Sequence, residues 1–237
     1  MGRAYEVRKA SILKTGAAKA KLYSMYAKEI YQMAKTGGVD PDSNQQLKRL
    51  IERAKKEQVP TDIVKRAIDK VNSGAAENYD AVRYEIFGPG GSTLIVDCLT
   101  DNVNRTLSYI RPALNKNNGK MGVTGSVAYM YENLCVVGFK GLDAEEALEL
   151  MIENDIDVDD IETTDSVIIY GNPTDLYRIK EAVEKELSDV NFEIDEIVMI
   201  PKDKITLVGE ELATFEKMLK MLDDIEDVQH IYHNVEI

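Results

Sequence analysis

The spacing of apolar residues changes character along the chain. Over residues 1–74 they recur at intervals of three and four, the spacing of amphipathic helices. The pattern predicts three helices with short connections, which together make a small bundle. The breaks and starts between them are Gly37-Gly38, Asp40-Pro41, Val59-Pro60 and Ser73-Gly74. We expect the first helix over residues 17–35 and the second to open at Asp40-Pro41.

Shorter apolar runs follow residue 78 and predict strands. Runs at 84–87 and 93–99 flank Gly88-Pro89-Gly90-Gly91, which is typical of a hairpin turn. A helix is expected over residues 103–117, where Pro112 should bend or shorten it. A further strand is expected over residues 126–131.

The elements expected between residues 134 and 200 alternate in the order β-α-β-β-α-β, which is the ferredoxin-like arrangement. Their ranges are 135–140, 143–153, 158–162, 166–170, 173–187 and 192–200. The tail predicts a strand at 205–208, a helix at 210–222 and a strand at 228–232, which we expect to return to the earlier sheet. The prediction is an α+β fold of three domains. These are a basic helical domain over 1–77, a discontinuous α+β domain over 78–133 and 202–237, and an inserted ferredoxin-like domain over 134–201.

Charge is divided unevenly along this plan. The 237 residues carry a net charge of -13, which taken alone argues against a nucleic-acid partner. Residues 1–74, however, hold 16 basic and 8 acidic side chains, a net of +8. The remaining 13 basic and 34 acidic side chains give -21, and the two parts together give -13. A basic module on an acidic body confines any phosphate contact to the N-terminal third.

Lysines repeat every seven residues at positions 14, 21, 28 and 35, and the last three of these lie on the first predicted helix. A helix drifts only about 20° per seven residues, so these side chains share one stripe. Such a surface suits a polyanion, although a solvated helix face explains the same pattern without a partner. The candidate nucleic-acid-binding residues of the helices and the preceding arm are Arg3, Arg8, Lys9, Lys14, Lys21, Lys28, Lys35, Lys48, Arg49, Arg53, Lys55 and Lys56.

Other chemistry is not supported by the residue patterns. Cys98 and Cys135 are too few for a disulfide framework, and His230 and His233 should face opposite sides of a strand. No nucleophile-base or paired-carboxylate arrangement stands out. We therefore expect a non-enzymatic protein with no metal, cofactor or small-molecule substrate. No apolar run approaches a membrane span and no secretion signal opens the chain, which predicts a cytoplasmic protein.

Several segments resemble one known family. They are Gly37-Gly38-Val39-Asp40-Pro41, Val59-Pro60, Arg66-Ala67-Ile68, Arg83 to Gly91, Leu99 to Thr106, Gly125 to Tyr129 and Tyr232-His233-Asn234. In this order they resemble the YebC family, and Met1-Gly2-Arg3 is most similar to its YeeN-type branch. The resemblance spans the whole chain. Two departures are Ala4-Tyr5, where the family carries a Lys-Trp pair, and Pro112 within a helix that is normally uninterrupted.

The resemblance implies a regulator of gene expression. The family is customarily described as transcriptional regulators that bind promoter DNA, which is the first hypothesis. Relatives that include the mitochondrial translational activator act on the ribosome and on proline-rich nascent chains, so a ribosome-associated translation factor is the alternative. The expected partner is therefore DNA or ribosomal RNA. No dimerising pattern is present, so we expect a monomer.

The motif Asp101-Asn102-Val103-Asn104-Arg105-Thr106 admits two interpretations. It is typical of a capped helix start in which Arg105 anchors to a neighbouring element. Alternatively, it faces a partner beside the loop from Lys116 to Gly125. We favour the structural role on residue type. The possible partner-binding residues under the second interpretation are Asn102, Asn104, Arg105, Lys116 and Lys120.

Overall fold

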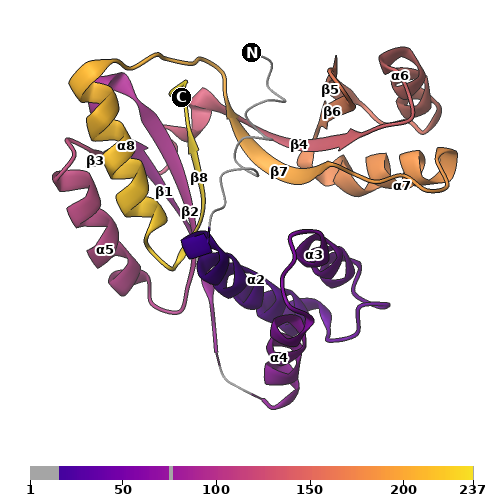
Figure 1. Cartoon of the computed structure of the whole chain (residues 1–237), viewed down its shortest axis with the longest axis horizontal. Helices are drawn as coiled ribbons and strands as arrows, with labels where there is room; N and C mark the ends of the chain where they lie inside the picture. The colour runs from indigo at the N-terminus through magenta and orange to yellow at the C-terminus, as the bar shows by residue number, and fades with distance from the viewer. Residues whose placement is uncertain (1–15, 75–76, 237) are drawn as a thin grey trace. The chain divides into compact units, whose positions relative to one another are not determined.

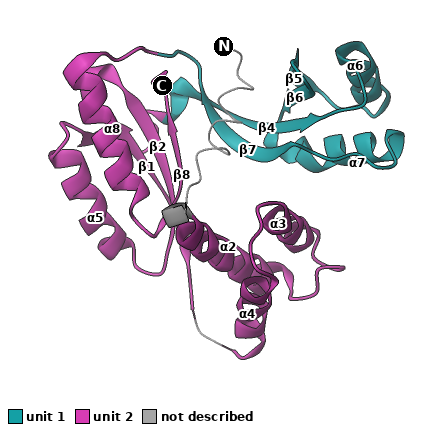
Figure 2. Ribbon diagram, in the orientation of Figure 1, with its two compact units in different colours: residues 1–13, 128–204 teal, residues 14–127, 205–237 magenta. Residues whose placement is uncertain are grey.

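The structure is a computed structural model that describes residues 16–74 and 77–236 (Figure 1). The described residues fall into two compact units, one made of residues 128–204 and the other of the remainder (Figure 2). Each unit carries one four-stranded sheet. Three separate hydrophobic cores lie in the helical segment, around the first sheet and around the second. The α+β fold class is confirmed. Within the described residues, no helix combines the length and apolarity that crossing a membrane requires.

The N-terminal segment forms the three helices that its periodicity predicts. They are α2 (Gly16–Gly37), α3 (Gln45–Lys56) and α4 (Thr61–Asn72). Residues of α2 at four-residue intervals, among them Leu22, Tyr26 and Ile30, point into a core that also receives Leu47 of α3 and Val64 of α4. Burial of one apolar stripe per helix holds this bundle together.

The second helix does not open at Asp40-Pro41, so that prediction is wrong. Asp40 belongs to a turn, and its side-chain oxygens accept hydrogen bonds from the amide of Asp42 and the hydroxyl of Ser43. Asn44 caps α3 instead. Its Oδ1 accepts from the amide of Leu47 at 3.1 Å, and its Nδ2 donates to the carbonyls of Met33 and Gly38. A side chain that satisfies both ends of the connection decides where the helix begins.

The first sheet has the order β3-β1-β2-β8 and is antiparallel. Its strands are β1 (Asp80–Phe87), β2 (Thr93–Thr100), β3 (Lys120–Met121) and β8 (Val228–His233). The turn at Pro89–Gly91 joins β1 to β2 and confirms the hairpin. Gly90 and Gly91 have φ of 62° and 80°, the left-handed region that glycine adopts without a steric penalty. The pairing of β8 with β2 confirms that the tail returns to this sheet.

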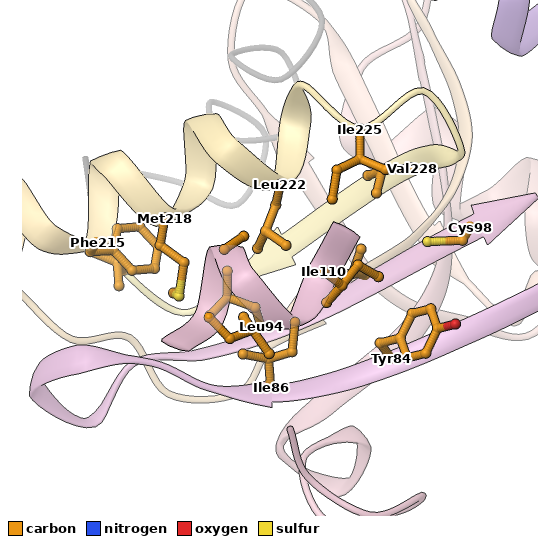
Figure 3. Packing of buried hydrophobic residues seen from close by; sticks show 14 of the residues in the cluster. Tyr84, Ile86, Leu94, Cys98, Ile110, Phe215, Met218, Leu222, Ile225 and Val228 are labelled. Carbon is orange, nitrogen blue, oxygen red and sulfur yellow. The ribbon is translucent and has the colours of Figure 1, made fainter. Parts of the chain in front are cut away.

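Two helices, α5 (Val103–Asn115) and α8 (Gly209–Asp223), supply the core that covers one face of this sheet. Alternate residues of the paired strands face them, with Tyr84 opposite Val96 and Ile86 opposite Leu94. Figure 3 shows Ile110 of α5 and Leu222 of α8 packed among these strand residues.

Helix α5 runs through Pro112 and ends at Asn115, two residues before the end that the sequence predicts. Pro112 lacks the amide that would donate to the carbonyl of Ser108. Two other local predictions in this part are wrong. Residues 128–130 form a 3-10 turn rather than a strand. Residues 205–208 make a single bridge, Ile205 with Val235, instead of a strand.

The unit of residues 128–204 has the predicted β-α-β-β-α-β order. Its elements are β4 (Tyr131–Phe139), α6 (Ala144–Glu153), β5 (Val158–Thr163), β6 (Val167–Gly171), α7 (Leu176–Glu186) and β7 (Ile194–Pro201). The antiparallel strand order β5-β6-β4-β7 places the first and third strands in the centre, as in ferredoxin-like folds. The predicted domain borders at 134 and 201 lie inside this unit.

Candidate nucleic-acid interface

Each of the three helices carries exposed basic residues, and three of them lie on α3. Leu47 and Ala54 of this helix are buried, whereas Lys48, Lys55 and Lys56 are exposed. Lys48 and Lys55 are seven residues apart, so they share one side of the helix. In residues 16–74 and 77–236, neither of these two lysines forms an ion pair. Their ammonium groups are thus available to a phosphate.

The arginines of α3 are turned more toward the protein. Arg53 donates through Nε to the hydroxyl of Tyr26 at 3.2 Å and through Nη2 to Glu29 at 3.5 Å. Burial raises the pKa of Tyr26 well above its usual value, against the opposing influence of the Arg53 charge. Arg49 is half-buried and also has interactions within the chain. Arg53 therefore fastens α3 to α2 rather than extending the exposed surface.

The lysine stripe of α2 is engaged by the protein's own acidic residues. Lys21 pairs with Asp223 at 2.8 Å, and Lys28 pairs with Asp227 at 2.8 Å. The side chains of Lys21 and Lys28 are only 17% and 11% exposed. The heptad spacing aligns these two lysines toward one partner, as the sequence predicts, but the partner they meet is a segment of this chain about 200 residues away.

Lys35 at the end of α2 is held by the connection that leads to the sheet. Its Nζ donates to the carbonyl of Glu77 and to Oδ1 of Asn78, both at 2.5 Å. It also lies 5.7 Å from the ring centre of Tyr31. Lys35 is exposed, yet its ammonium group already has three partners in the protein.

Asp227 joins the helical segment to the first sheet. Its carboxylate accepts from Lys28 at 2.8 Å, from the hydroxyl of Thr106 at 2.8 Å and from Arg105 at 3.1 Å. Burial works to raise the pKa of Asp227, but the hydrogen bonds from Lys28, Thr106 and Arg105 outweigh it and hold the pKa below its usual value. Asp227 is therefore ionised at neutral pH and bridges two parts of the fold.

The motif at 101–106 has the geometry of a capped helix start. The side chain of Asn102 accepts from the amide of Arg105 at 3.0 Å, which caps α5. The guanidinium of Arg105 contacts Asp101 at 2.6 Å as well as Asp227. These contacts confirm the predicted capping and anchoring. Asn104 is exposed on the same turn.

The other two candidates of that set lie beyond the far end of α5. Lys116 is the residue that ends the helix, and Lys120 lies in β3 opposite Phe87. Both are exposed. Among the described residues, no contact links these two lysines to the basic residues of α3. Their role in binding a partner stays a prediction.

Four candidates, Arg3, Arg8, Lys9 and Lys14, lie outside the described residues. Helix α4 adds basic residues that the sequence reasoning passed over. Lys65 is exposed, Arg66 pairs with Asp62 one turn away at 2.6 Å, and Lys70 pairs with Glu77 at 2.5 Å. Their positions outside the apolar stripe of α4 could have indicated that these three side chains lie on the surface.

The two histidines lie as strand alternation predicts. The ring of His233 packs edge-on against Phe215 of α8 at 5.3 Å. The ring of His230 stacks on Tyr232 at 6.0 Å. Because residues three apart on a strand face opposite sides, these two imidazoles do not converge on one ion.

Family models match both parts of the chain. Residues 3–74 match the model described as "TACO1/YebC protein N-terminal domain". Residues 79–235 match the model described as "TACO1/YebC second and third domain". The chain belongs to the TACO1/YebC family. The border between the two models falls at the connection from α4 to β1.

TACO1/YebC relatives align with the chain from end to end. A protein of Shewanella oneidensis is 48% identical over 100% of this chain and 99% of its own length. One of Marinobacter nauticus is 48% identical with the same coverage, and one of Vibrio parahaemolyticus is 47% identical over 100% of both chains. All three carry the name "Probable transcriptional regulatory protein".

A solved structure shares the TACO1/YebC fold of this chain. It is the crystal structure of a conserved hypothetical protein, Aq1575, from Aquifex aeolicus. The two chains are 34% identical, and the match has a TM-score of 0.76 over 93% of this chain and 91% of the other. The arrangement of helices and sheets described above is thus found in a second protein with two thirds of its aligned residues changed.

Proposed function

We propose that this protein regulates gene expression by binding nucleic acid, and that the outer face of α3 supplies its phosphate contacts. The observation that carries the proposal is the exposure of Lys48, Lys55 and Lys56 on a twelve-residue helix with a single acidic residue, Glu52. Lysines on one helix face neutralise backbone phosphates and release the counterions condensed there. The name of the relatives, probable transcriptional regulatory protein, supports a role in transcription.

Phosphate contacts position a protein on nucleic acid without reading its sequence. Duplex DNA, the partner that transcription requires, is the first candidate. Ribosomal RNA presents the same phosphate chemistry, and the acidic remainder of the chain repels both in the same way. An experiment therefore has to distinguish DNA from RNA as the partner, because the charge of α3 suits both.

The test removes two lysines that have no ion pair among the described residues. We expect Lys48→Gln/Lys55→Gln to weaken binding to a short duplex DNA by about tenfold near physiological salt, and to reduce the slope of log affinity against log salt by about 2. Fluorescence anisotropy over a salt series, with an RNA hairpin measured in parallel, gives both quantities.

The matched control is Lys185→Gln/Lys217→Gln, which removes two exposed lysines outside the helical segment. It lowers the net charge equally and should leave the slope unchanged. Equal effects of the two double variants would show that only total charge matters and would reject the α3 surface. Sedimentation of cell lysate on a sucrose gradient then separates the partners. Loss of ribosome co-migration in the α3 variant favours translation, whereas a protein at the top of the gradient that binds a promoter fragment favours transcription.

A further inference from the structure

An acidic segment covers the last residue of α8 and the link to β8, and it contacts the lysine stripe of α2. Its residues are Asp223, Asp224, Ile225, Glu226 and Asp227. Its backbone is set by the core, because Ile225 is buried and Val228 follows it into the same cluster (Figure 3). The apolar anchor leaves the neighbouring carboxylates to face α2. The segment thus carries negative charge on a fixed support.

The spacing of the two partners matches. Lys21, Ser24 and Lys28 lie three and four residues apart, which places them along one side of α2. They contact Asp223, Glu226 and Asp227 in that order, at 2.8, 2.9 and 2.8 Å. Lys21, Ser24 and Lys28 thus each donate to a carboxylate oxygen, as they would to the phosphate oxygens of a nucleic acid.

These contacts fall into two classes of burial. The side chains of Lys28 and Asp227 are 11% and 5% exposed, and Arg105 and Thr106 reinforce that pair. The side chains of Asp223 and Glu226 are 66% and 71% exposed, although that of Lys21 is 17% exposed. A pair with one solvated partner is weaker and more screened by salt than a pair buried on both sides, so a ligand displaces it more easily.

We propose that the acidic segment is a built-in competitor of nucleic acid for Lys21 and Ser24 of α2. In the protein without nucleic acid, the carboxylates of Asp223 and Glu226 accept the hydrogen bonds that these two groups donate. A bound polyanion takes their place, while Lys28 stays paired with Asp227 and keeps the two parts of the fold joined. The proposal rests on the nucleic-acid binding proposed above and adds a regulated part to that surface.

A purely structural contact makes a different prediction. If Asp223 and Glu226 served only to hold α2 in place, removing their charges would lower the stability of the fold and leave the salt slope of binding unchanged. If they compete with phosphate, removing their charges leaves Lys21 held only by the backbone carbonyl of Asp223, and its positive charge then adds to binding. The salt slope distinguishes the two, because each additional phosphate neutralised adds about 0.9 to it.

The experiment compares two double variants of the full chain with equal net charge. Asp223→Asn/Glu226→Gln neutralises the acids that contact Lys21 and Ser24. Asp224→Asn/Glu216→Gln neutralises two exposed acids close by. Binding of a short duplex DNA and of an RNA hairpin is measured over a salt series. We expect the first variant to bind about 3- to 10-fold more tightly than wild type with a slope steeper by about 0.9, and the second to change the slope little.

Adding Lys21→Gln to the first variant is the decisive control, since it should cancel the gain in affinity. A wild-type protein that binds, with both double variants indistinguishable from each other, overturns the competitor and leaves the proposed function standing. If neither wild type nor the Asp223→Asn/Glu226→Gln variant binds DNA or RNA at low salt, the proposed function fails and the competitor fails with it. A gain that persists in the presence of Lys21→Gln would place the added contact elsewhere and also reject the competitor.

Discussion

At the scale of single residues, the buried carboxylate of Asp227 joins two helices. It accepts hydrogen bonds from Lys28 of α2 and from Arg105 and Thr106, which are neighbours in the first turn of α5. A buried charge of this kind is tolerated because every oxygen is satisfied. If the carboxylate is replaced by an amide, Lys28 and Arg105 face an uncharged group.

We expect Asp227→Asn to lower the free energy of unfolding by about 2–4 kcal/mol at neutral pH, because a buried pair loses one partner. The folded-state pKa of Asp227 is lowered, so its contribution is full above the unfolded value of about 3.9 and is lost as the pH falls through the folded value. Urea unfolding should therefore show a larger difference in the free energy of unfolding between wild type and Asp227→Asn at pH 7 than near pH 3.

The neighbouring Asp224→Asn is the control for this prediction. Asp224 is exposed, so its substitution should change stability by no more than about 0.5 kcal/mol at either pH. A deficit of Asp227→Asn that stayed the same in acid would assign it to lost packing rather than lost charge.

At the scale of elements, the start of α3 shows how one side chain orders a connection. Asn44 is buried and joins the end of α2 to the beginning of α3 through three hydrogen bonds. The exposed lysines of α3 depend on this cap for their placement, because the helix begins directly after it. The cap thus connects local structure to the proposed phosphate surface.

We expect Asn44→Ala to cost about 1–3 kcal/mol in the free energy of unfolding, since it removes a helix cap and leaves two carbonyls without their donor. Ser43→Ala removes only an exposed hydrogen bond to Asp40 and should cost less than about 0.5 kcal/mol. Urea titration monitored by circular dichroism measures both. Equal losses in the two variants would mean that the turn, rather than the cap, stabilises this connection.

At the scale of the whole molecule, each sheet has its own core. Leu222 lies in the cluster of the first sheet and Ile179 in that of the second, and both are fully buried. Every core residue loses its apolar contacts and leaves a cavity when it is shortened to alanine. The two clusters therefore give a pair of matched probes.

We expect Ile179→Ala to cost about 2–5 kcal/mol locally and to speed hydrogen exchange in β4 and β6. Leu222→Ala should do the same in β1 and β2. Hydrogen-exchange mass spectrometry with peptides from all four strands is the measurement. Faster exchange in β1 and β2 on Ile179→Ala, to the same extent as in β4 and β6, would contradict the assignment of separate cores.

Much of the fold was predictable because periodicity is a local property. Leu22, Tyr26 and Ile30 recur at the spacing of a helix, and short apolar runs marked the strands on either side of the glycine turn at residues 88–91. The errors have a common cause. The apolar run at 205–208 is suited to a strand, but a strand forms only where a neighbouring backbone offers its hydrogen bonds. Asp40 and Asn44 are both good caps, and only the carbonyls of Met33 and Gly38 selected Asn44.

The sequence by itself determined most of the helices and strands, and the stripe that Lys21 and Lys28 share on α2. Only the tertiary structure decided what that stripe meets. The acidic segment lies about 200 residues away along the chain, and its position opposite α2 follows from the return of α8 and β8 to the first sheet. Charge pairing depends on distance in space, and no spacing within one helix encodes that distance. For this reason, a pattern that predicts phosphate contact on α2 places two of its lysines against the protein's own carboxylates.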